Sequence, residues 1–236
     1  VFGGEQLPAG MVSAWREAAP NSAIFNLYGP TEATVFCLAQ SGALPVTPGR
    51  DVIAIGTPLP GNEAAVFDAN GQPVADGTPG ELAIAGIQLA AGYLGAPELT
   101  AARFPTHAGK RWYLTGDQAI RDATGNFHCL GRIDNQIKIN GYRVELEEID
   151  AHLRLVTGTD VVASVAWPIV DGTARGIVGI VGAEDIDSTA IIAQLKQRLP
   201  AYMLPTRVLG RESLPLNQSG KVDRKALLGW LDGLNA

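Results

Sequence analysis

Residues 131–149 read GRIDNQIKINGYRVELEEI, and this stretch separates two regions of different pattern. Charged side chains interrupt an otherwise apolar, alternating run at Arg132, Asp134, Lys138 and Arg143. Such a density of charge between two folded regions indicates a hinge with a binding edge, although an exposed charged strand has the same pattern. We therefore expect one folded unit on each side of this stretch.

The N-terminal region has the pattern of short strands and turns. Residues 11–19 predict a helix that ends before Pro20, and residues 24–27 predict a short strand after it. From about residue 52 to residue 130, short apolar runs are cut by turn residues. This long stretch predicts a small antiparallel sheet or barrel.

The C-terminal region alternates between helix and strand patterns. Residues 147–156 place apolar side chains on one face of a helix. The β-branched runs at 161–167 and 176–181 predict strands. Ser188 is a candidate N-cap for a helix through Leu199. This alternation predicts a separate small α/β domain.

The composition excludes several classes of protein. The chain has 236 residues, of which 46% are hydrophobic and 18% charged, as in a globular protein with two modest cores. Its net charge of -6 argues against a nucleic-acid binder. No apolar run approaches the roughly 20 residues of a membrane helix, and the first residues do not resemble a signal peptide. Cys37 and Cys129 predict two buried thiols, which fits a reducing cytoplasm. The histidines lack the spacing of a zinc site.

Residues 26–32, NLYGPTE, form a polar segment that does not fit core packing. A strand leads to Tyr28, and the following Gly-Pro pair breaks it, which leaves Thr31 and Glu32 at a loop tip. A hydroxyl and a carboxylate at such a tip suit a phosphate and Mg²⁺, because Mg²⁺ takes one or two carboxylates together with phosphate oxygens. A Gly-Pro turn with a solvated glutamate has the same pattern.

Residues 113–117, YLTGD, place Asp117 after Thr-Gly at the end of a predicted strand. A carboxylate in this position can accept hydrogen bonds from both hydroxyls of a ribose. Taken alone, the same residues also fit a plain turn.

Residues 217–225, NQSGKVDRK, place Lys221 after Ser-Gly in a predicted loop. A mobile ammonium group is a suitable point charge for the negative charge that develops on an oxyanion or a phosphate in a transition state. A lone Gly-Lys pair is a weak signal, because the full phosphate-loop pattern is absent. The basic side chains around it also fit a solvated face that meets an acidic partner.

Taken together and in this order, these segments resemble the core motifs of the adenylate-forming (AMP-binding) superfamily. The resemblance is strongest to amino-acid adenylation domains of nonribosomal peptide synthetases and to D-alanine–carrier protein ligases. The matching segments span nearly the whole chain at the expected separation: NLYGPTE (26–32), GELAIAGIQLAAGYL (80–94), YLTGD (113–117), GRIDNQIKINGYRVELEEI (131–149), LPAYMLP (199–205) and NQSGKVDRK (217–225).

The resemblance implies a nucleotide and metal site in the first motif. Tyr28 would stack on the adenine of ATP, with Gly29 beside it in the nucleotide site. Thr31 would contact phosphate as part of the catalytic set, and Glu32 would hold Mg²⁺.

The resemblance also assigns roles further along the chain. Asp117 would bind the ribose hydroxyls, with Arg132 nearby. Asp134 would be the hinge about which the small domain rotates between adenylation and thioester formation. Lys221 would bridge the substrate carboxylate and the α-phosphate, and Gly141 would line the path of the carrier's phosphopantetheine arm.

The family fold is a large α/β domain joined to a small one. Residues 1–133 would then be the C-terminal part of the large domain, including a small β-barrel, and residues 134–236 the whole small mobile subdomain. The family's phosphate loop and the aspartate that binds an amino group would precede Val1. We therefore expect the isolated chain to be inactive and to need that N-terminal part. The ribose motif departs from the family pattern at Leu114 and Gln118, and both changes spare its aspartate.

The substrate wall implied by the resemblance is apolar or small. It would include Val1, Gly3, Leu27, Val35 and Phe36, closed by the motif lysine. Burying an unpaired charge against such a wall costs several kcal/mol. The wall therefore favours an uncharged, small to medium aliphatic amino acid.

The expected function is ATP-dependent activation of an amino acid as aminoacyl-AMP, followed by transfer to the phosphopantetheine thiol of an acyl or peptidyl carrier protein. The alternatives are an acyl- or aryl-acid–CoA ligase of the same superfamily and a non-catalytic docking module. Retention of Glu32, Asp117 and Lys221 argues against the docking module, which needs none of them. We expect a cytoplasmic enzyme with neither a nucleic-acid nor a membrane partner.

Overall fold

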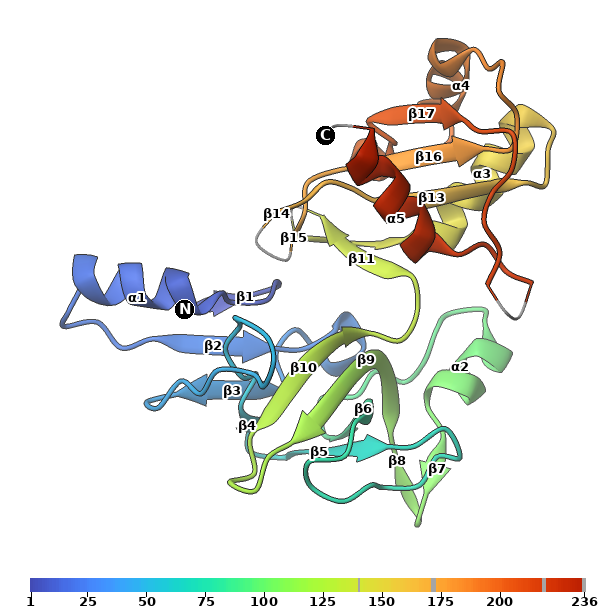
Figure 1. Cartoon of the computed structure of the whole chain (residues 1–236). Helices are drawn as coiled ribbons and strands as arrows, with labels where there is room; N and C mark the ends of the chain where they lie inside the picture. The colour runs from blue at the N-terminus through green and yellow to red at the C-terminus, as the bar shows by residue number, and fades with distance from the viewer. Residues whose placement is uncertain (140, 171–172, 218–219, 235–236) are drawn as a thin grey trace. The chain divides into compact units, whose positions relative to one another are not determined.

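The computed structural model (Figure 1) contains two compact units, Val1–Asp134 and Asn135–Ala236. Each unit encloses its own clusters of buried apolar side chains. The mixed α/β class predicted from the sequence is confirmed. The structure describes residues 1–139, 141–170, 173–217 and 220–234.

The first unit begins with a four-stranded sheet in the order β1-β2-β3-β4. Its β1 runs parallel to β2, and the other neighbours are antiparallel. Helix α1 packs Val12 into a small apolar cluster with Ile24 and Ile53, so the predicted helix is confirmed. The elements are β1 (Phe2–Gly3), α1 (Ala9–Ala18), β2 (Phe25–Tyr28), η1 (Thr31–Ala33), β3 (Leu38–Ser41) and β4 (Thr57–Pro58).

The second sheet of this unit is antiparallel throughout, in the order β10-β9-β6-β5. Alternate residues of β6 enter different clusters: Leu82 and Ile84 lie in one, and Ala83 and Ala85 in another. The backbone of Phe127 bonds to segment 55–56, which joins this sheet to the first one. The elements are β5 (Asn62–Phe67), β6 (Gly80–Gly86), α2 (Pro97–Arg103), β7 (Thr106–His107), β8 (Lys110–Arg111), β9 (Tyr113–Arg121) and β10 (Phe127–Arg132).

The second unit is built on a three-stranded sheet in the order β13-β16-β17. Val162 and Val208 lie in a cluster with residues of α3 and α4, whereas Ala163 and Ile180 pack with residues of α5. Helices therefore cover both faces of this sheet (Figure 1). The elements are β11 (Gln136–Ile139), β12 (Tyr142–Glu145), α3 (Leu146–Thr157), β13 (Val162–Ala166), β14 (Ile169–Val170), β15 (Thr173–Ala174), β16 (Ile177–Val181), α4 (Ser188–Leu195), η2 (Ala201–Met203), β17 (Arg207–Gly210) and α5 (Arg224–Gly233).

Two sequence predictions about α4 were wrong. The N-cap is Asp187 and not Ser188, because the Asp187 carboxylate accepts a hydrogen bond of 2.9 Å from the backbone N–H of Ala190. The helix ends at Leu195, after which the backbone N–H of Arg198 bonds to the Leu195 carbonyl in a tighter turn.

The two cysteines differ in burial. Cys37 is buried as expected, but Cys129, which lies on β10 just before a shift in strand register, is only partly buried. Among the helices of the described chain, none combines the length and apolar character that a membrane span requires.

Candidate active site

Three of the expected nucleotide-binding residues lie in contact within the first unit. Tyr28 ends β2, Asp117 lies on β9, and Arg132 is the register partner of Asp117 on β10. The Tyr28 hydroxyl donates a hydrogen bond to Oδ2 of Asp117, and Nη1 of Arg132 lies 3.1 Å from Oδ1. The structure therefore holds one carboxylate between a phenol and a guanidinium group.

Arg132 also binds Asp134 in a bidentate pair. Its Nε and Nη2 donate to the two Asp134 oxygens at 2.7 and 2.5 Å. Gly116 is required beside this pair, because it has a φ of +74° and a Cβ there would lie 2.5 Å from atoms of both partners. Its N–H donates to Glu81, which orients the turn of the ribose motif.

Burial and nearby charges shift the pKa of Tyr28 and of Arg132. Burial raises the pKa of Tyr28 well above its ordinary value, and the nearby Asp117 charge raises it further, so the phenol remains a donor. For Arg132, burial lowers the pKa, but Asp134 and Asp117 outweigh it and raise the pKa overall. A carboxylate offers about four lone-pair sites. Asp117 is thus able to accept ribose hydroxyls beside its two protein partners.

The expected metal carboxylate is held by a tyrosine. Glu32 lies in η1 and is buried, and its Oε1 accepts a hydrogen bond of 2.6 Å from the Tyr93 hydroxyl. Burial and this bond raise the pKa of Tyr93. Thr31, one position earlier, is exposed.

The donor chemistry around Glu32 fits a magnesium ion that is held mainly by a nucleotide. Among the described residues, no three His, Cys, Asp or Glu side chains gather as a metal cluster. Mg²⁺ in nucleotide sites needs only one or two carboxylates, because phosphate oxygens and waters complete its shell. A single carboxylate at Glu32 satisfies this requirement.

Three of the residues expected in the substrate wall lie close to one another. Gly3 on β1 is the register partner of Leu27 on β2. A Cβ on Gly3 would lie 2.8 Å from the Phe36 ring, so these three residues lie together. Val1 and Val35 are exposed.

Gly29 allows the loop after η1 to fold back on the end of β2. A Cβ at Gly29 would lie 2.4 Å from the Val35 carbonyl oxygen and 2.8 Å from the Phe36 Cα. A larger residue would therefore displace the loop that carries the expected wall.

Lys221 lies in the second unit, on a short hairpin turn. The Asn217 N–H donates to the Lys221 carbonyl at 2.7 Å, and the Lys221 N–H donates to the Asn217 side chain at 3.0 Å. Its side chain is exposed. Within the same motif, Gln218 and Ser219 lie outside the described residues.

Arg224 ties the end of this motif to the core of the second unit. Its Nη2 lies 2.5 Å from Oδ2 of Asp150, and its Nε donates to the Ser164 carbonyl at 3.0 Å. Asp150 also accepts two hydrogen bonds of 2.6 Å from Ser164. Burial raises the pKa of Asp150, although the hydrogen bonds of Ser164 and the charge of Arg224 oppose this effect.

The remaining expected residues lie at turns. Asp134 is the last residue of the first unit. Gly141 follows β11 with a φ of +80°, at the turn into β12.

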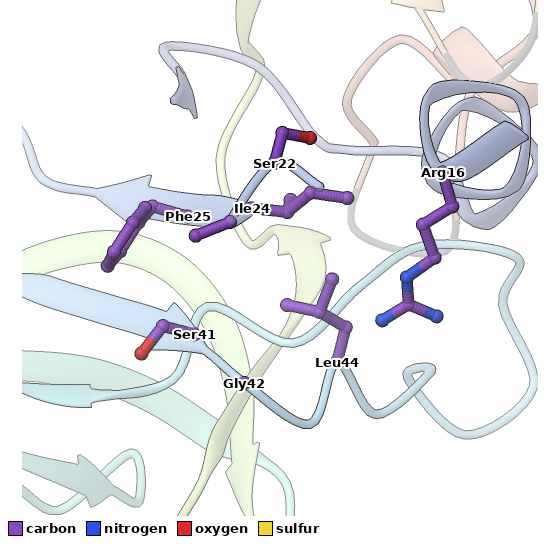
Figure 2. A pocket seen from close by; sticks show the side chains of 8 residues that line it. Arg16, Ser22, Ile24, Phe25, Ser41, Gly42 and Leu44 are labelled. Atoms are coloured by element: carbon purple, nitrogen blue, oxygen red, sulfur yellow. The ribbon is translucent and has the colours of Figure 1, made fainter. Parts of the chain in front are cut away.

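A cavity of about 280 Å³ lies elsewhere in the first unit, between α1 and the strands β2 and β3 (Figure 2). It contains none of the residues expected from the sequence. Its lining residues are Arg16, Ser22, Ala23, Ile24, Phe25, Ser41, Gly42 and Leu44.

Gln88 and Tyr93, which contact the expected site residues Phe36 and Glu32, were not identified from the sequence. The contact of Arg224 with Asp150 in the second unit was not identified either. Gln88 and Tyr93 lie in the segment GELAIAGIQLAAGYL, and Arg224 lies in NQSGKVDRK. The only indication of their importance in the sequence was that they lie inside segments that match the family motifs. Their partners are distant in sequence, so the segments alone did not reveal their contacts.

Comparison with known proteins gives matches over both units. Residues 1–94 match the family described as AMP-binding enzyme. Malpinin synthetase of Mortierella alpina is 39% identical over 246 residues, which cover 96% of the chain and 3% of that protein.

Two solved structures are also similar. The Vibrio cholerae adenylation domain AlmE, in complex with glycyl-adenosine-5'-phosphate, has a TM-score of 0.87 and 33% identity over 98% of the chain and 44% of that chain. Holo-PA1221, an NRPS protein containing adenylation and PCP domains bound to a vinylsulfonamide inhibitor, has a TM-score of 0.75 and 30% identity. That match covers 97% of the chain and 40% of PA1221. The chain thus spans less than half of each of these proteins.

Proposed function

Because the chain belongs to the family of AMP-binding enzymes, the adenylate-forming ligases, we propose that it is part of an amino-acid adenylation domain. The domain activates an amino acid with ATP as aminoacyl-AMP and then transfers the aminoacyl group to the phosphopantetheine thiol of a carrier protein. The cluster of Tyr28, Asp117 and Arg132 is the observation that supports nucleotide binding by the chain.

In the first reaction, the substrate carboxylate attacks the α-phosphorus of ATP, and pyrophosphate leaves. Asp117 accepts hydrogen bonds from the ribose hydroxyls and is held in place by Tyr28 and Arg132. Stacking of Tyr28 on the adenine stays a prediction. The Tyr28 side chain packs in the apolar cluster of the first unit that contains Leu38 and Phe127. Thr31 contacts phosphate from its exposed position at the start of η1.

Glu32 would hold Mg²⁺, which would neutralise phosphate charge. The Tyr93 hydroxyl orients the Glu32 carboxylate. Lys221 contributes a positive charge between the substrate carboxylate and the α-phosphate, which stabilises the charge that develops during transfer. Its place on an exposed turn suits a group that must approach and leave the reacting atoms.

In the second reaction, the carrier thiol attacks the acyl carbon, and AMP leaves. We assign residues 1–133 to the C-terminal part of the large domain and residues 134–236 to the small mobile subdomain, with Asp134 as the hinge. Gly141 lines the path of the pantetheine arm. The presence of adenylation and PCP domains together in PA1221 supports a carrier partner.

The substrate is an uncharged, small to medium aliphatic amino acid. The contact between Gly3, Leu27 and Phe36 places small and apolar groups on one wall, where a charged side chain would find no partner. The glycyl adenylate bound by the similar AlmE domain supports a small amino acid.

The test is amino-acid-dependent ATP–pyrophosphate exchange by the protein that contains this chain. A panel of L-, D- and β-amino acids is compared with simple carboxylic acids, and Lys221→Ala serves as the control. We expect exchange with one or a few small aliphatic amino acids and its loss in the control. Exchange with plain carboxylic acids alone would replace this proposal with an acyl- or aryl-acid ligase. Residues 1–236 in isolation are expected to show no turnover.

A further inference from the structure

The loop between η1 and β3 has an uncommon backbone conformation. Thr34 and Val35 have φ values of +52° and +71°, in the left-handed region that β-branched residues rarely adopt. Such conformations persist only where the surrounding structure holds them, and they are frequent at functional sites. The loop leads to Phe36, so its shape affects the expected substrate wall, whereas the Glu32 carboxylate before the loop is held separately by Tyr93.

Gln88 supplies the contacts that hold this loop. Its Nε2 donates to the Phe36 carbonyl at 3.0 Å and to the Thr34 carbonyl at 3.3 Å. In return, Oγ1 of Thr34 donates to the Gln88 carbonyl at 2.7 Å. These three hydrogen bonds lie on both sides of Val35.

The amide of Gln88 is itself oriented by a second side chain. Nδ2 of Asn62, the first residue of β5, donates a hydrogen bond to Oε1 of Gln88. This contact leaves the Gln88 amide nitrogen to face the two carbonyl groups of the loop. The orientation is specific to an amide, because it requires an acceptor on one side and a donor on the other.

Gly29 also confines the loop. The Val35 carbonyl and the Phe36 Cα lie so close to Gly29 that a Cβ there would meet both. Gln88 and Gly29 therefore leave little freedom for the positions of Val35 and Phe36.

We propose that Gln88, oriented by Asn62, is a positioning residue that fixes Val35 and Phe36 and thereby determines which amino acid the site accepts. The inference rests on the proposed function, because it concerns the acid-binding wall of that same site. Gln88 acts through the loop backbone.

A purely structural role would lower stability and change all kinetic constants together. A positioning role changes the KM for the amino acid much more than the KM for ATP, because the loop carries the wall and the ribose contact lies on β9. The two roles are therefore separable by kinetics.

The test uses Gln88→Glu and Gln88→Met in the protein that contains the chain. Gln88→Glu keeps the size of the side chain but replaces the donor with an oxygen that faces two carbonyl groups. Gln88→Met removes both the donor and the acceptor. Exchange assays with the preferred amino acid and with larger and smaller analogues give the two KM values for each variant. Gln72→Glu, at an exposed glutamine in the turn after β5, is the matched control.

We expect the KM for the preferred amino acid to rise about tenfold in both Gln88 variants, with the KM for ATP changed less than about twofold. The ratio of kcat/KM between the preferred amino acid and its larger and smaller analogues should decrease, because the wall discriminates less by size. Asn62→Ala should give a smaller rise in the same direction. Equal changes in both KM values, or an unchanged amino-acid profile, would overturn the inference while leaving the proposed function intact.

Amide hydrogen exchange provides a readout that does not depend on turnover. The N–H groups of Phe36 and Cys37 bond to the carbonyl groups of Thr34 and Tyr28. Both amides should exchange faster in Gln88→Met than in the wild-type protein, and unchanged protection would show that Gln88 does not hold the loop. If the wild-type protein shows no ATP–pyrophosphate exchange with any amino acid, the proposed function is overturned, and with it the role of Gln88 in amino-acid selection.

Discussion

The Tyr28 hydroxyl donates a hydrogen bond to Oδ2 of Asp117, across 89 positions of sequence. The bond joins the end of β2 in one sheet to β9 in the other. Since burial raises the pKa of Tyr28, the phenol remains protonated and keeps the role of donor. A buried tyrosine thereby fixes the direction of the carboxylate to which we assign the ribose contact.

Tyr28→Phe should weaken ATP binding and lower stability. The change removes the donor and leaves one carboxylate oxygen without its protein partner, which typically costs about 1–3 kcal/mol. We expect a several-fold rise in the KM for ATP in the exchange assay and a lower midpoint of urea unfolding. Tyr142→Phe, at an exposed tyrosine of the second unit, is the matched control. An unchanged KM for ATP would show that Tyr28 does not support the ribose contact of Asp117.

Asp122 should make the stability of the chain depend on pH in the acid range. Burial raises the pKa of Asp122, but hydrogen bonds from His128, Thr124 and Asn126 outweigh this effect and hold it below its ordinary value. A carboxyl with a lowered folded pKa contributes stability that is fully present above its unfolded value of about 3.9 and is lost as the pH falls.

Asp122→Asn should therefore destabilise the chain by about 1 kcal/mol at pH 7, and this difference should shrink as the pH falls from 5 to 3. Urea unfolding followed by tryptophan fluorescence at each pH measures it. Asp51→Asn, at an exposed aspartate, should show no such trend. A difference that stays constant with pH would assign the effect to packing and not to the charge of Asp122.

Local patterns in the sequence were sufficient to place most elements. Residues on one face of a strand or helix recur at a fixed period, so the sequence pattern indicates which of them are buried. This pattern predicted the β-branched strands β13 and β16 and the apolar face of α3. The cap of α4 was misplaced, since Asp187 and Ser188 are both good cap residues and only the backbone conformation decides between them.

From the sequence, only those site residues could be predicted that lie in motifs with a role implied by the family resemblance. Tyr28 and Asp117 were expected to serve one nucleotide, and the structure brings them into contact. The contacts of Gln88 with Phe36 span 52 positions, and those of Arg224 with Asp150 span 74. Such pairs depend on how distant elements pack, which no local pattern specifies.

Arg224→Met should destabilise the second unit. The change leaves the Asp150 carboxylate buried without its guanidinium partner, and breaking such a pair typically costs about 3–5 kcal/mol. Urea unfolding measures the loss. Trp167 is a suitable probe, because its indole N–H donates to Asp232 on α5.

The double variant Arg224→Met with Asp150→Asn provides the control. It removes both charges, so it should recover part of the lost stability. Strictly additive losses would show that the two side chains are not energetically coupled.

Lys221→Ala should separate the two half-reactions. The lysine provides positive charge where the α-phosphate and the substrate carboxylate react, and removal of one such transition-state contact typically lowers the rate by about 10²–10³-fold. Thioester formation from supplied aminoacyl-AMP needs no such charge and should be largely retained. Pyrophosphate exchange and transfer to a holo carrier protein are measured side by side. Lys225→Ala, at an exposed lysine on the adjoining helix, is the matched control and should leave both reactions nearly unchanged. Equal loss of both half-reactions in Lys221→Ala would contradict its assignment to adenylation, because a residue specific to the first step cannot limit the second.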